Sequence, residues 1–199
     1  MSAVACYVAL GDSFTCGREE ERAFRWPDEV ARQVRAGRYE NLAWVGATSR
    51  DVEEGQLERA LELQPDLVSL ICGANDVLFS VRPDADGYAS RLARMFRRLR
   101  EAVPRAVIVT ATYPDLSRFL DLRKRTRSRV RGGMRSFNDA VRGVARAYGA
   151  VCLDWAGHPE GPQPAHLADD GFHPSEEGHR EAAAQVVRAL PPVEAIAAR

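Results

Sequence analysis

Three residues of this 199-residue sequence have the types and the spacing of a nucleophile, a base and an orienting acid. A serine hydroxyl is a weak nucleophile at neutral pH, so catalysis needs a base beside it and a third group that orients the base. Ser13 lies three positions after the end of the apolar run Val4–Leu10, and Asp170 precedes His173 by three positions. This spacing lets the carboxylate accept the Nδ1 proton of the imidazole, which leaves Nε2 free to act as the base. We therefore predict a catalytic triad of Ser13, Asp170 and His173.

These residues belong to four short motifs that together resemble the SGNH, or GDSL, hydrolase superfamily. The motifs follow the family's order along the chain, and they are Gly11–Ser13, a glycine after the second apolar run at Gly46, Gly73–Asp76 and Asp170–His173. The resemblance implies a carboxylic ester hydrolase that forms an acyl-enzyme on Ser13. His173 would be the general base, and Asp170 would orient it.

The same resemblance implies how the charged intermediate is stabilised. A tetrahedral intermediate needs hydrogen-bond donors for its oxyanion. The family's three donors correspond here to the N–H of Ser13, the N–H of Gly46 and the side-chain amide of Asn75. No metal or organic cofactor is implied, and the expected partner is a small or short-acyl ester. An acyltransferase with the same triad stays open as an alternative, as does a non-catalytic binding protein that uses the basic segment described below.

Each motif also has a purely structural interpretation when it is taken alone. Glycine, aspartate and serine are common turn residues, so Gly11–Ser13 could be an ordinary turn. Asn75 could cap a helix, and Asp170 and His173 could lie in a surface loop. Four motifs in one order favour the catalytic interpretation. The sequence lacks the G-x-S-x-G motif of the α/β-hydrolase elbow.

Three other histidines are weaker candidates for the base. His158 follows Asp154 at a spacing one residue longer than that of the C-terminal motif. His166 lies in a loop rich in proline and glycine, where we expect it to be solvated. His179 falls early in the last predicted helix, at a position that we expect to be half-buried.

Cys16, three residues after Ser13, is an alternative nucleophile, but the resemblance assigns the reaction to the serine. The other cysteines lie in apolar runs and are expected to be buried thiols, because no spacing suits a disulfide framework. Reduced thiols predict a cytoplasmic protein. A zinc site is a further alternative, although nothing fixes a tetrahedral spacing among its possible ligands, which are Asp169, Asp170, His173 and His179.

Five short apolar runs, separated by segments with helical periodicity, predict the fold. Two of them are apolar on both faces, which is typical of strands in a parallel sheet that helices cover on both sides. The alternation predicts a three-layer α/β/α sandwich with a flavodoxin-like five-stranded parallel sheet. The predicted strands are Val4–Leu10, Tyr39–Trp44, Leu67–Cys72, Ala106–Thr112 and Ala150–Trp155.

Helices are predicted from apolar spacing and from the proline and glycine residues at their ends. They run from Pro27 to about Gly37, around Leu57–Leu61, and over Leu92–Val103, Phe137–Tyr148 and Pro174–Leu190. No linker divides the chain, so residues 1–199 are expected to form one domain, with 191–199 as a frayed tail. Such a sheet binds ligands at the carboxyl ends of its strands, where Ser13, Gly46 and Asn75 would lie.

Charge and apolar content argue against several classes of partner. The 28 Lys and Arg residues balance 28 Asp and Glu residues, and nucleic-acid binding depends on phosphate neutralisation by an excess of cations. No apolar run approaches the roughly 18 residues of a membrane-spanning helix, so stable membrane association is not expected. The apolar N-terminal run leads directly into the Ser13 motif, and we interpret it as a strand and not as a signal peptide.

A basic segment, residues 118–135, contains eight cations and a single acid, Asp121. It follows the fourth predicted strand and should lie at the catalytic edge of the sheet. A solvated helix or loop, a lid that faces the substrate, and a contact with a membrane or a nucleic acid are all open interpretations. Arginine binds phosphate and carboxylate through paired donors, so Arg123, Arg125 and Arg127 are candidate substrate-binding residues for an ester with an anionic group.

Overall fold

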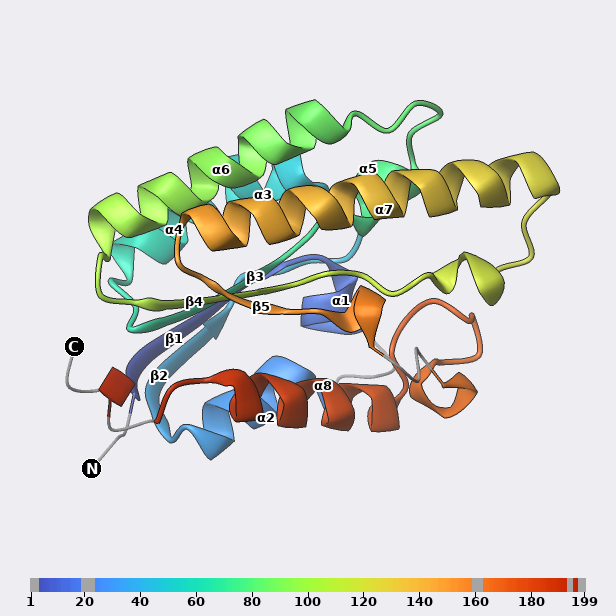
Figure 1. The fold of residues 1–199 in the computed structure, drawn as a ribbon. Coiled ribbons are helices and arrows are strands. Elements are labelled where there is room, and N and C mark those ends of the chain that lie inside the picture. Colours follow the sequence, from blue (N-terminus) through green and yellow to red (C-terminus); the bar gives the residue numbers. More distant parts are fainter. Residues whose placement is uncertain (1–3, 19–23, 159–162, 193–194, 197–199) are drawn as a thin grey trace.

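A computed structural model describes residues 4–18, 24–158, 163–192 and 195–196 of the chain. It confirms the predicted three-layer α/β/α sandwich, in which helices cover both faces of a five-stranded parallel sheet (Figure 1). The order of the strands, β2-β1-β3-β4-β5, is the predicted flavodoxin-like one. The strands are β1 (Val4–Gly11), β2 (Ala36–Asn41), β3 (Leu67–Ile71), β4 (Val107–Ala111) and β5 (Val151–Leu153).

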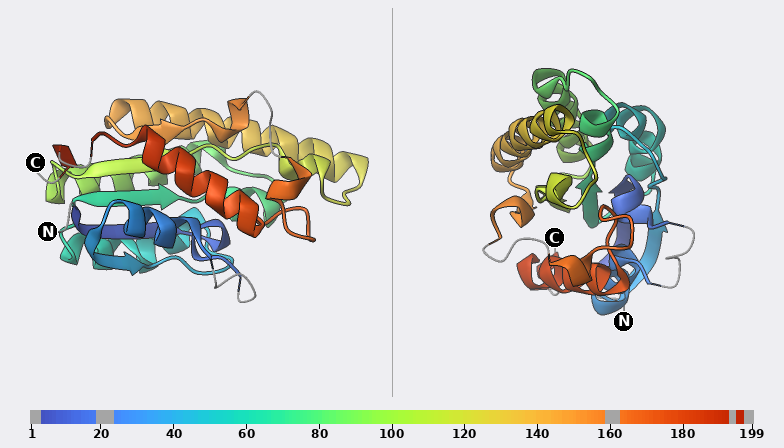
Figure 2. Two further views of the ribbon diagram at one scale, coloured as in Figure 1. Left: turned by 90° about the horizontal axis from the view of Figure 1, so that it is seen from below. Right: turned by 90° about the vertical axis from the view of Figure 1, so that its right-hand side faces the viewer.

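The helices divide into two layers, which Figures 1 and 2 show from three sides. One layer contains α3 (Ser49–Gly55), α4 (Leu57–Glu62), α5 (Ala74–Leu78), α6 (Ala85–Ala102) and α7 (Lys124–Ala147), and the other contains α2 (Trp26–Gln33) and α8 (Glu176–Ala189). Short elements follow three of the strands at their carboxyl ends. These are α1 (Ser13–Cys16) after β1 and the 3₁₀ turns η2 (Leu116–Arg118) after β4 and η3 (Trp155–Gly157) after β5, with η4 (Pro164–His166) further along.

The central strands form the core as their composition predicts. Every residue of β3 and β4 is buried, because helices cover both faces of these strands. The amphipathic helix α6 turns one face toward the sheet, and its buried residues recur at helical spacing. They are Tyr88, Leu92, Met95, Phe96 and Leu99.

Two predicted boundaries differ from the structure around the edge strand β2. The predicted helix that reaches Gly37 ends at Gln33, and the strand begins at Ala36 and ends at Asn41. The reason is Arg35, whose φ of 52° breaks the helix and starts the strand. An edge strand buries few of its side chains, so its apolar pattern marks its position poorly.

The basic segment, which the sequence left open between helix and loop, is helical from Lys124 onward. It forms the first half of α7, a helix of 24 residues that is about 36 Å long at 1.5 Å per residue. The predicted helix Phe137–Tyr148 is the second half of the same element. Its buried residues line one continuous face, and they are Val130, Met134, Phe137, Asn138, Val141, Val144 and Ala145.

The stretch expected to be a frayed tail is described only at 191–192 and 195–196, and the rest lies outside the described residues. Ile196 is buried in the hydrophobic core, which is not what a frayed tail predicts. Within the described ranges, no helix is both long and apolar enough to cross a membrane.

Candidate active site

The structure brings Ser13, His173 and Asp170 together at the carboxyl edge of the sheet. Ser13 is the first residue of α1, and its Oγ lies 2.9 Å from His173 Nε2. The other ring nitrogen, Nδ1, lies 2.6 Å from Asp170 Oδ2. Ser13 is almost fully buried, whereas Asp170 is about a third exposed. The serine, the imidazole and the carboxylate therefore form one continuous hydrogen-bonded relay.

The turn that presents Ser13 depends on Gly11. Its φ of 154° and its close approach to β3 both require glycine, because a Cβ there would lie 2.3 Å from the carbonyl oxygen of Ile71. The buried side chain of Gln56 holds this glycine on both sides. Gln56 Oε1 accepts from the Gly11 N–H at 2.8 Å, and Gln56 Nε2 donates to the Gly11 carbonyl at 2.8 Å. Strand β1 therefore ends at one fixed position beside Ser13.

Asp12 begins helix α1 and is itself buried. Its Oδ1 accepts from the Phe14 N–H at 2.9 Å, and its Oδ2 accepts from the Tyr113 hydroxyl at 3.0 Å. Burial raises the pKa of Asp12 to about 7, although both hydrogen bonds favour the charged form. Asn138 of α7 fixes Tyr113 in turn, since its side-chain amide accepts from the Tyr113 N–H and donates to the Tyr113 carbonyl, each at 2.8 Å.

A tight turn carries both Asp170 and His173. Asp170 Oδ1 accepts from the N–H groups of Phe172 and His173, each at 2.9 Å. Gly171 has a φ of 66°, and a Cβ on it would lie 2.8 Å from the Phe119 carbonyl oxygen. Partial burial raises the pKa of Asp170, but the hydrogen bonds from His173 and Phe172 outweigh it and bring the pKa to about 2. The carboxylate that faces the imidazole is therefore charged over the whole neutral range.

Of the two other predicted oxyanion residues, Gly46 lies in the loop before α3 and Asn75 lies in α5, and hydrogen bonds join these two segments. Asn75 is buried in α5, and its Nδ2 donates to the carbonyl of Ala47 at 2.9 Å. Asp76 accepts from the Ser49 N–H at 2.8 Å and from the Ser49 hydroxyl at 2.5 Å. Gly46, with a φ of 83°, lies in the loop that these bonds hold against the end of β3. An amide has two donor hydrogens, so the contact with Ala47 leaves one hydrogen of Asn75 for another acceptor.

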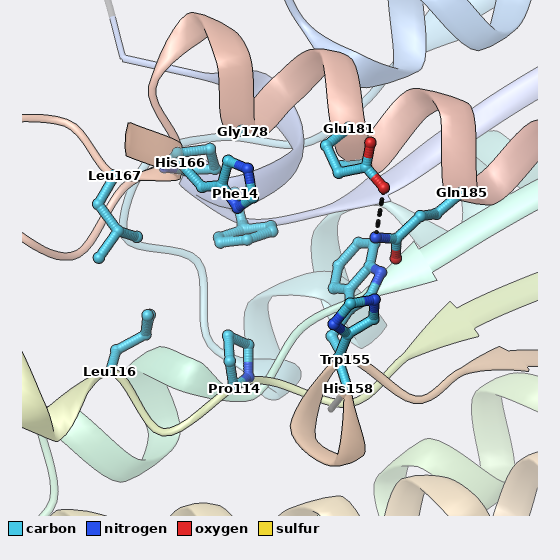
Figure 3. Close-up of a pocket in the computed structure, with 12 residues that line it drawn as sticks. Phe14, Pro114, Leu116, Trp155, His158, His166, Leu167, Gly178, Glu181 and Gln185 are labelled. Carbon is cyan, nitrogen blue, oxygen red and sulfur yellow. Dashed lines mark hydrogen bonds between the residues drawn. The ribbon is translucent and has the colours of Figure 1, made fainter. Parts of the chain in front are cut away.

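A cavity of about 320 Å³ lies beside residues that adjoin the relay in the chain, and Figure 3 shows the side chains that line it. Phe14 and Pro174, the chain neighbours of Ser13 and His173, both line it. Figure 3 shows an apolar side and, across from it, a polar side where Gln185 donates to Glu181 at 2.8 Å. The remaining lining residues are Pro114, Leu116, Trp155, His158, His166, Leu167, Gly178 and Ala182.

It is His173, and not one of the three histidines that the sequence argued against, that contacts Ser13 Oγ. His158 and His166 both line the cavity. His158 is exposed, whereas His166 is partly buried where a solvated position was expected. His179 is fully buried where a half-buried position was expected. Its Nδ1 accepts from the N–H of Trp26 at 3.4 Å, so it joins α8 to α2 in the core.

The cysteines and the possible metal ligands are the remaining candidates for chemistry. All four cysteines are free thiols, and the Cys16 thiol donates to the carbonyl of Gly17 at 3.2 Å. Burial raises the pKa of the Cys72 thiol well above its ordinary value. In the part of the chain that the structure describes, no group of three or more His, Cys, Asp and Glu side chains could hold a metal ion.

The basic segment divides into cations that hold loops and cations that face solvent. Arg127, one of the three candidate substrate-binding residues, donates to the carbonyls of Ser117 and Leu120 at 3.2 and 3.3 Å. Its guanidinium therefore braces the turn after β4. Arg123 and Arg125 are exposed at the start of α7. The role of Arg123, Arg125 and Arg127 in substrate binding stays a prediction.

A known protein family matches most of the chain. Residues 9–181 match the model of the GDSL-like lipase/acylhydrolase family. A protein assigned to the G-D-S-L lipolytic family of Desulfitobacterium hafniense has a similar structure, with a TM-score of 0.76 and 18% identity over 94% of this chain and 99% of that one. No curated protein sequence matches the chain.

Two further similar structures are those of characterised hydrolases. A catalytic variant of an acetylxylan esterase from Geobacillus stearothermophilus has a TM-score of 0.73 and 21% identity, over 93% of each chain. Phospholipase A1 from Streptomyces albidoflavus has a TM-score of 0.69 and 19% identity, over 94% of this chain and 99% of that one. At these identities the likeness concerns the fold.

Proposed function

Because the chain belongs to the GDSL-like lipase/acylhydrolase family, we propose that it is a serine ester hydrolase that forms an acyl-enzyme on Ser13. The observation that carries the proposal is the relay from Ser13 Oγ through His173 to Asp170, with contacts of 2.9 and 2.6 Å. A nucleophile, a base within hydrogen-bond reach of it and an acid that orients the base are the parts that acyl transfer requires.

In the first half of the reaction, Ser13 Oγ attacks the ester carbonyl carbon and His173 Nε2 takes the serine proton. The charge that forms on the imidazole faces Asp170, whose low pKa keeps it ionised as a counter-charge. The new oxyanion accepts hydrogen bonds from the N–H groups of Ser13 and Gly46 and from the amide of Asn75. His173 then gives its proton to the leaving alcohol as the C–O bond breaks.

The second half repeats these steps with water as the nucleophile. His173 takes a proton from the water as its oxygen attacks the acyl carbonyl, and the same donors stabilise the second oxyanion. Collapse of this intermediate releases the carboxylic acid and returns the proton to Ser13. Every proton transfer passes through the imidazole of His173, so the cycle needs no second general acid or base.

A small or short-acyl ester suits the space beside the relay. The cavity that Phe14 and Pro174 line has a volume of about 320 Å³, near the lower limit of the roughly 300–1,000 Å³ of small-molecule pockets. Its apolar side can take the hydrocarbon part of a substrate, and Glu181 and Gln185 can accept or donate hydrogen bonds to a polar part. We therefore assign this cavity to one of the two halves of the ester.

A panel of soluble esters with acyl chains of two to twelve carbons, run beside Ser13→Ala, tests the proposal. We expect turnover that is highest for short acyl groups and that disappears in the variant. A protein that hydrolyses none of these esters, or a variant as active as the natural protein, overturns the proposal. Adding an alcohol acceptor to the same assay distinguishes hydrolysis from acyl transfer.

A further inference from the structure

Large apolar side chains are exposed at the catalytic edge. Among the residues that the structure describes, four large apolar side chains are exposed, and they are Trp44 (41%), Val45 (59%), Phe79 (72%) and Val81 (83%). A single exposed apolar residue is ordinary, but a gathering of them marks an interaction surface. Trp44 and Val45 lie in the loop between β2 and α3, and Phe79 and Val81 lie in the loop between α5 and α6.

These two loops are held close to the proposed oxyanion residues. Trp44 and Val45 directly precede Gly46, and Phe79 follows α5, which contains Asn75. The hydrogen bond from Asn75 to Ala47, described above, ties the bases of the two loops together. The apolar side chains therefore lie on the same edge of the sheet as the Ser13 relay.

The start of α7 places exposed cations beside the second of these loops. Arg129 of α7 donates to the carbonyl of Val77 at 2.8 Å and also to that of Ser80, so the loop packs on the first half of the helix. In Figure 1 this half of α7 extends past the strands at the catalytic edge. The exposed cations of this region are Arg82, Arg123, Lys124 and Arg125. We call them, together with Trp44, Val45, Phe79 and Val81, the edge surface.

The charge at the start of α7 is not balanced within the helix. Its first turn contains no acidic residue, and the side chain of Arg123 at the N-cap makes no capping hydrogen bond. Cations repel the positive end of a helix dipole, so anions outside the helix would relieve the repulsion. Three exposed acids, Asp84, Asp86 and Asp121, lie near these four cations in the chain and leave a small positive excess. The complement of the edge surface is therefore anionic, and it offers an apolar layer for Phe79 and Val81.

We propose that the edge surface docks reversibly on an anionic lipid surface. Basic residues are attracted to anionic headgroups while apolar side chains enter the boundary between headgroups and acyl chains. A few exposed side chains give weak and salt-sensitive attachment, which is compatible with the prediction of no stable membrane association.

The test measures co-sedimentation of the Ser13→Ala protein with vesicles, so that it does not depend on turnover. We expect binding to vesicles that contain 30% phosphatidylglycerol, little binding to pure phosphatidylcholine, and release of the protein at 0.5 M salt. Replacing Arg123 and Arg125 by alanine should lower the partition coefficient at least about tenfold, from roughly fivefold per cation. Replacing Phe79 and Val81 by serine should lower it roughly tenfold, and replacing both by leucine should preserve it.

A matched control removes two exposed cations far from the edge surface. Arg105 lies just before β4 at the opposite edge, and Arg146 lies near the other end of α7. Arg105→Ala with Arg146→Ala should leave the partition coefficient within twofold, and circular dichroism checks that each variant is folded. The inference is overturned if neither vesicle binds, if the control pair matters as much as Arg123 and Arg125, or if a soluble polyanion binds equally well and independently of Phe79 and Val81.

Hydrolysis of a soluble short-acyl ester by the natural protein separates this inference from the proposed function. Hydrolysis without vesicle binding would refute docking on a lipid surface and leave the proposed ester hydrolysis by Ser13 intact. Vesicle binding without hydrolysis of any soluble or vesicle-borne ester would keep the docking surface and overturn the chemistry proposed for Ser13.

Discussion

The Tyr113 hydroxyl donates to the carboxylate of Asp12 at 3.0 Å, across 101 positions of the chain, and both side chains are buried. This bond places an acidic group of unusual pKa one residue before the nucleophile. It also links α7 to the turn that presents Ser13, because Asn138 of α7 fixes the backbone of Tyr113.

Asp12→Asn should change how stability depends on pH. The pKa of Asp12 is about 7 in the folded protein, well above its ordinary value. The stability that its protonated form contributes is therefore complete below pH 4 and is lost as the pH rises through 7. Asparagine stays neutral, so the variant should gain stability relative to the natural protein between pH 4 and 8. The gain is on the order of 4 kcal/mol, because the pKa is about 7 against an ordinary value of 3.8 and each pKa unit corresponds to about 1.4 kcal/mol.

Urea unfolding of both proteins at several pH values measures this difference. Asp170 and the other ionisable groups are common to both proteins, so their contributions cancel. Tyr113→Phe provides a second control, because it removes the hydrogen bond that stabilises the charged carboxylate of Asp12. Without this bond the pKa of Asp12 should rise, so the loss of stability should extend to higher pH. Parallel stability curves for the natural protein and Asp12→Asn would show that Asp12 does not titrate in this range.

Ser13→Ala should abolish both turnover and covalent labelling by a fluorophosphonate probe, with the fold intact. The hydroxyl supplies the covalent step, and only slow background catalysis from the oxyanion donors remains without it. Cys16→Ala should still be labelled, since it is the hydroxyl of Ser13 that contacts His173 Nε2. Mass spectrometry of the labelled peptide identifies the modified residue, and a label on Cys16 in Ser13→Ala would refute the assignment.

His173→Ala should lower kcat as much as Ser13→Ala does, because both groups act in one relay. His158 lines the cavity, so His158→Ala should leave kcat within about threefold and place any effect on KM. Steady-state kinetics on one short-acyl ester separates the two constants. Equal losses of kcat in the two histidine variants would mean that the base has been assigned to the wrong loop.

Asn75→Ala should lower kcat by roughly 10²–10³, the usual loss for one oxyanion donor, with a much smaller change in KM. The same change removes the bond to Ala47, so we also expect about 1 kcal/mol lower stability. Ser49→Ala is the control, because it loosens the same loop through Asp76 and keeps the amide of Asn75. A loss of kcat in Ser49→Ala as large as that in Asn75→Ala would assign Asn75 to loop positioning alone.

Soluble esters that carry an anionic group should be preferred over neutral esters of equal acyl length. The exposed cations at the start of α7 attract such substrates, and added salt shortens the Debye length from about 10 Å at 0.1 M to about 3 Å at 1 M. Arg123→Glu with Arg125→Glu should lower kcat/KM for the anionic ester by roughly fivefold or more and spare the neutral one. An equal response of both esters to salt and to these changes would show that the two arginines do not bind the substrate.

The layers of the fold and the members of the relay follow from the sequence, whereas the groups that fix the relay do not. Strands β3 and β4 are apolar on both faces, and Asp170 and His173 are three positions apart, so both leave a local signal. Gln56 and Asn138 act through single amide groups that hold distant backbone. Such a contact has no periodicity and no motif, and only the folded structure reveals it.

The helix α7 shows a second limit of sequence patterns. Its first half is dominated by charge, which hides the apolar spacing of Val130 and Met134 that continues into the second half. The start of α3 does have a sequence signal, because Thr48 and Asp51 have the spacing of a capping box and form one in the structure.

The relay joins one local contact to one very distant contact, and this has a consequence for how activity arises during folding. Asp170 and His173 meet within a single turn, but His173 and Ser13 are 160 positions apart. Closing so long a loop requires the C-terminal turn and α8 to have docked against the N-terminal part of the chain. A growing polypeptide, or one truncated before Asp170, has the nucleophile Ser13 without its base and its orienting acid. The rate at which turnover recovers after denaturation therefore measures how fast the turn that contains His173 docks against Ser13.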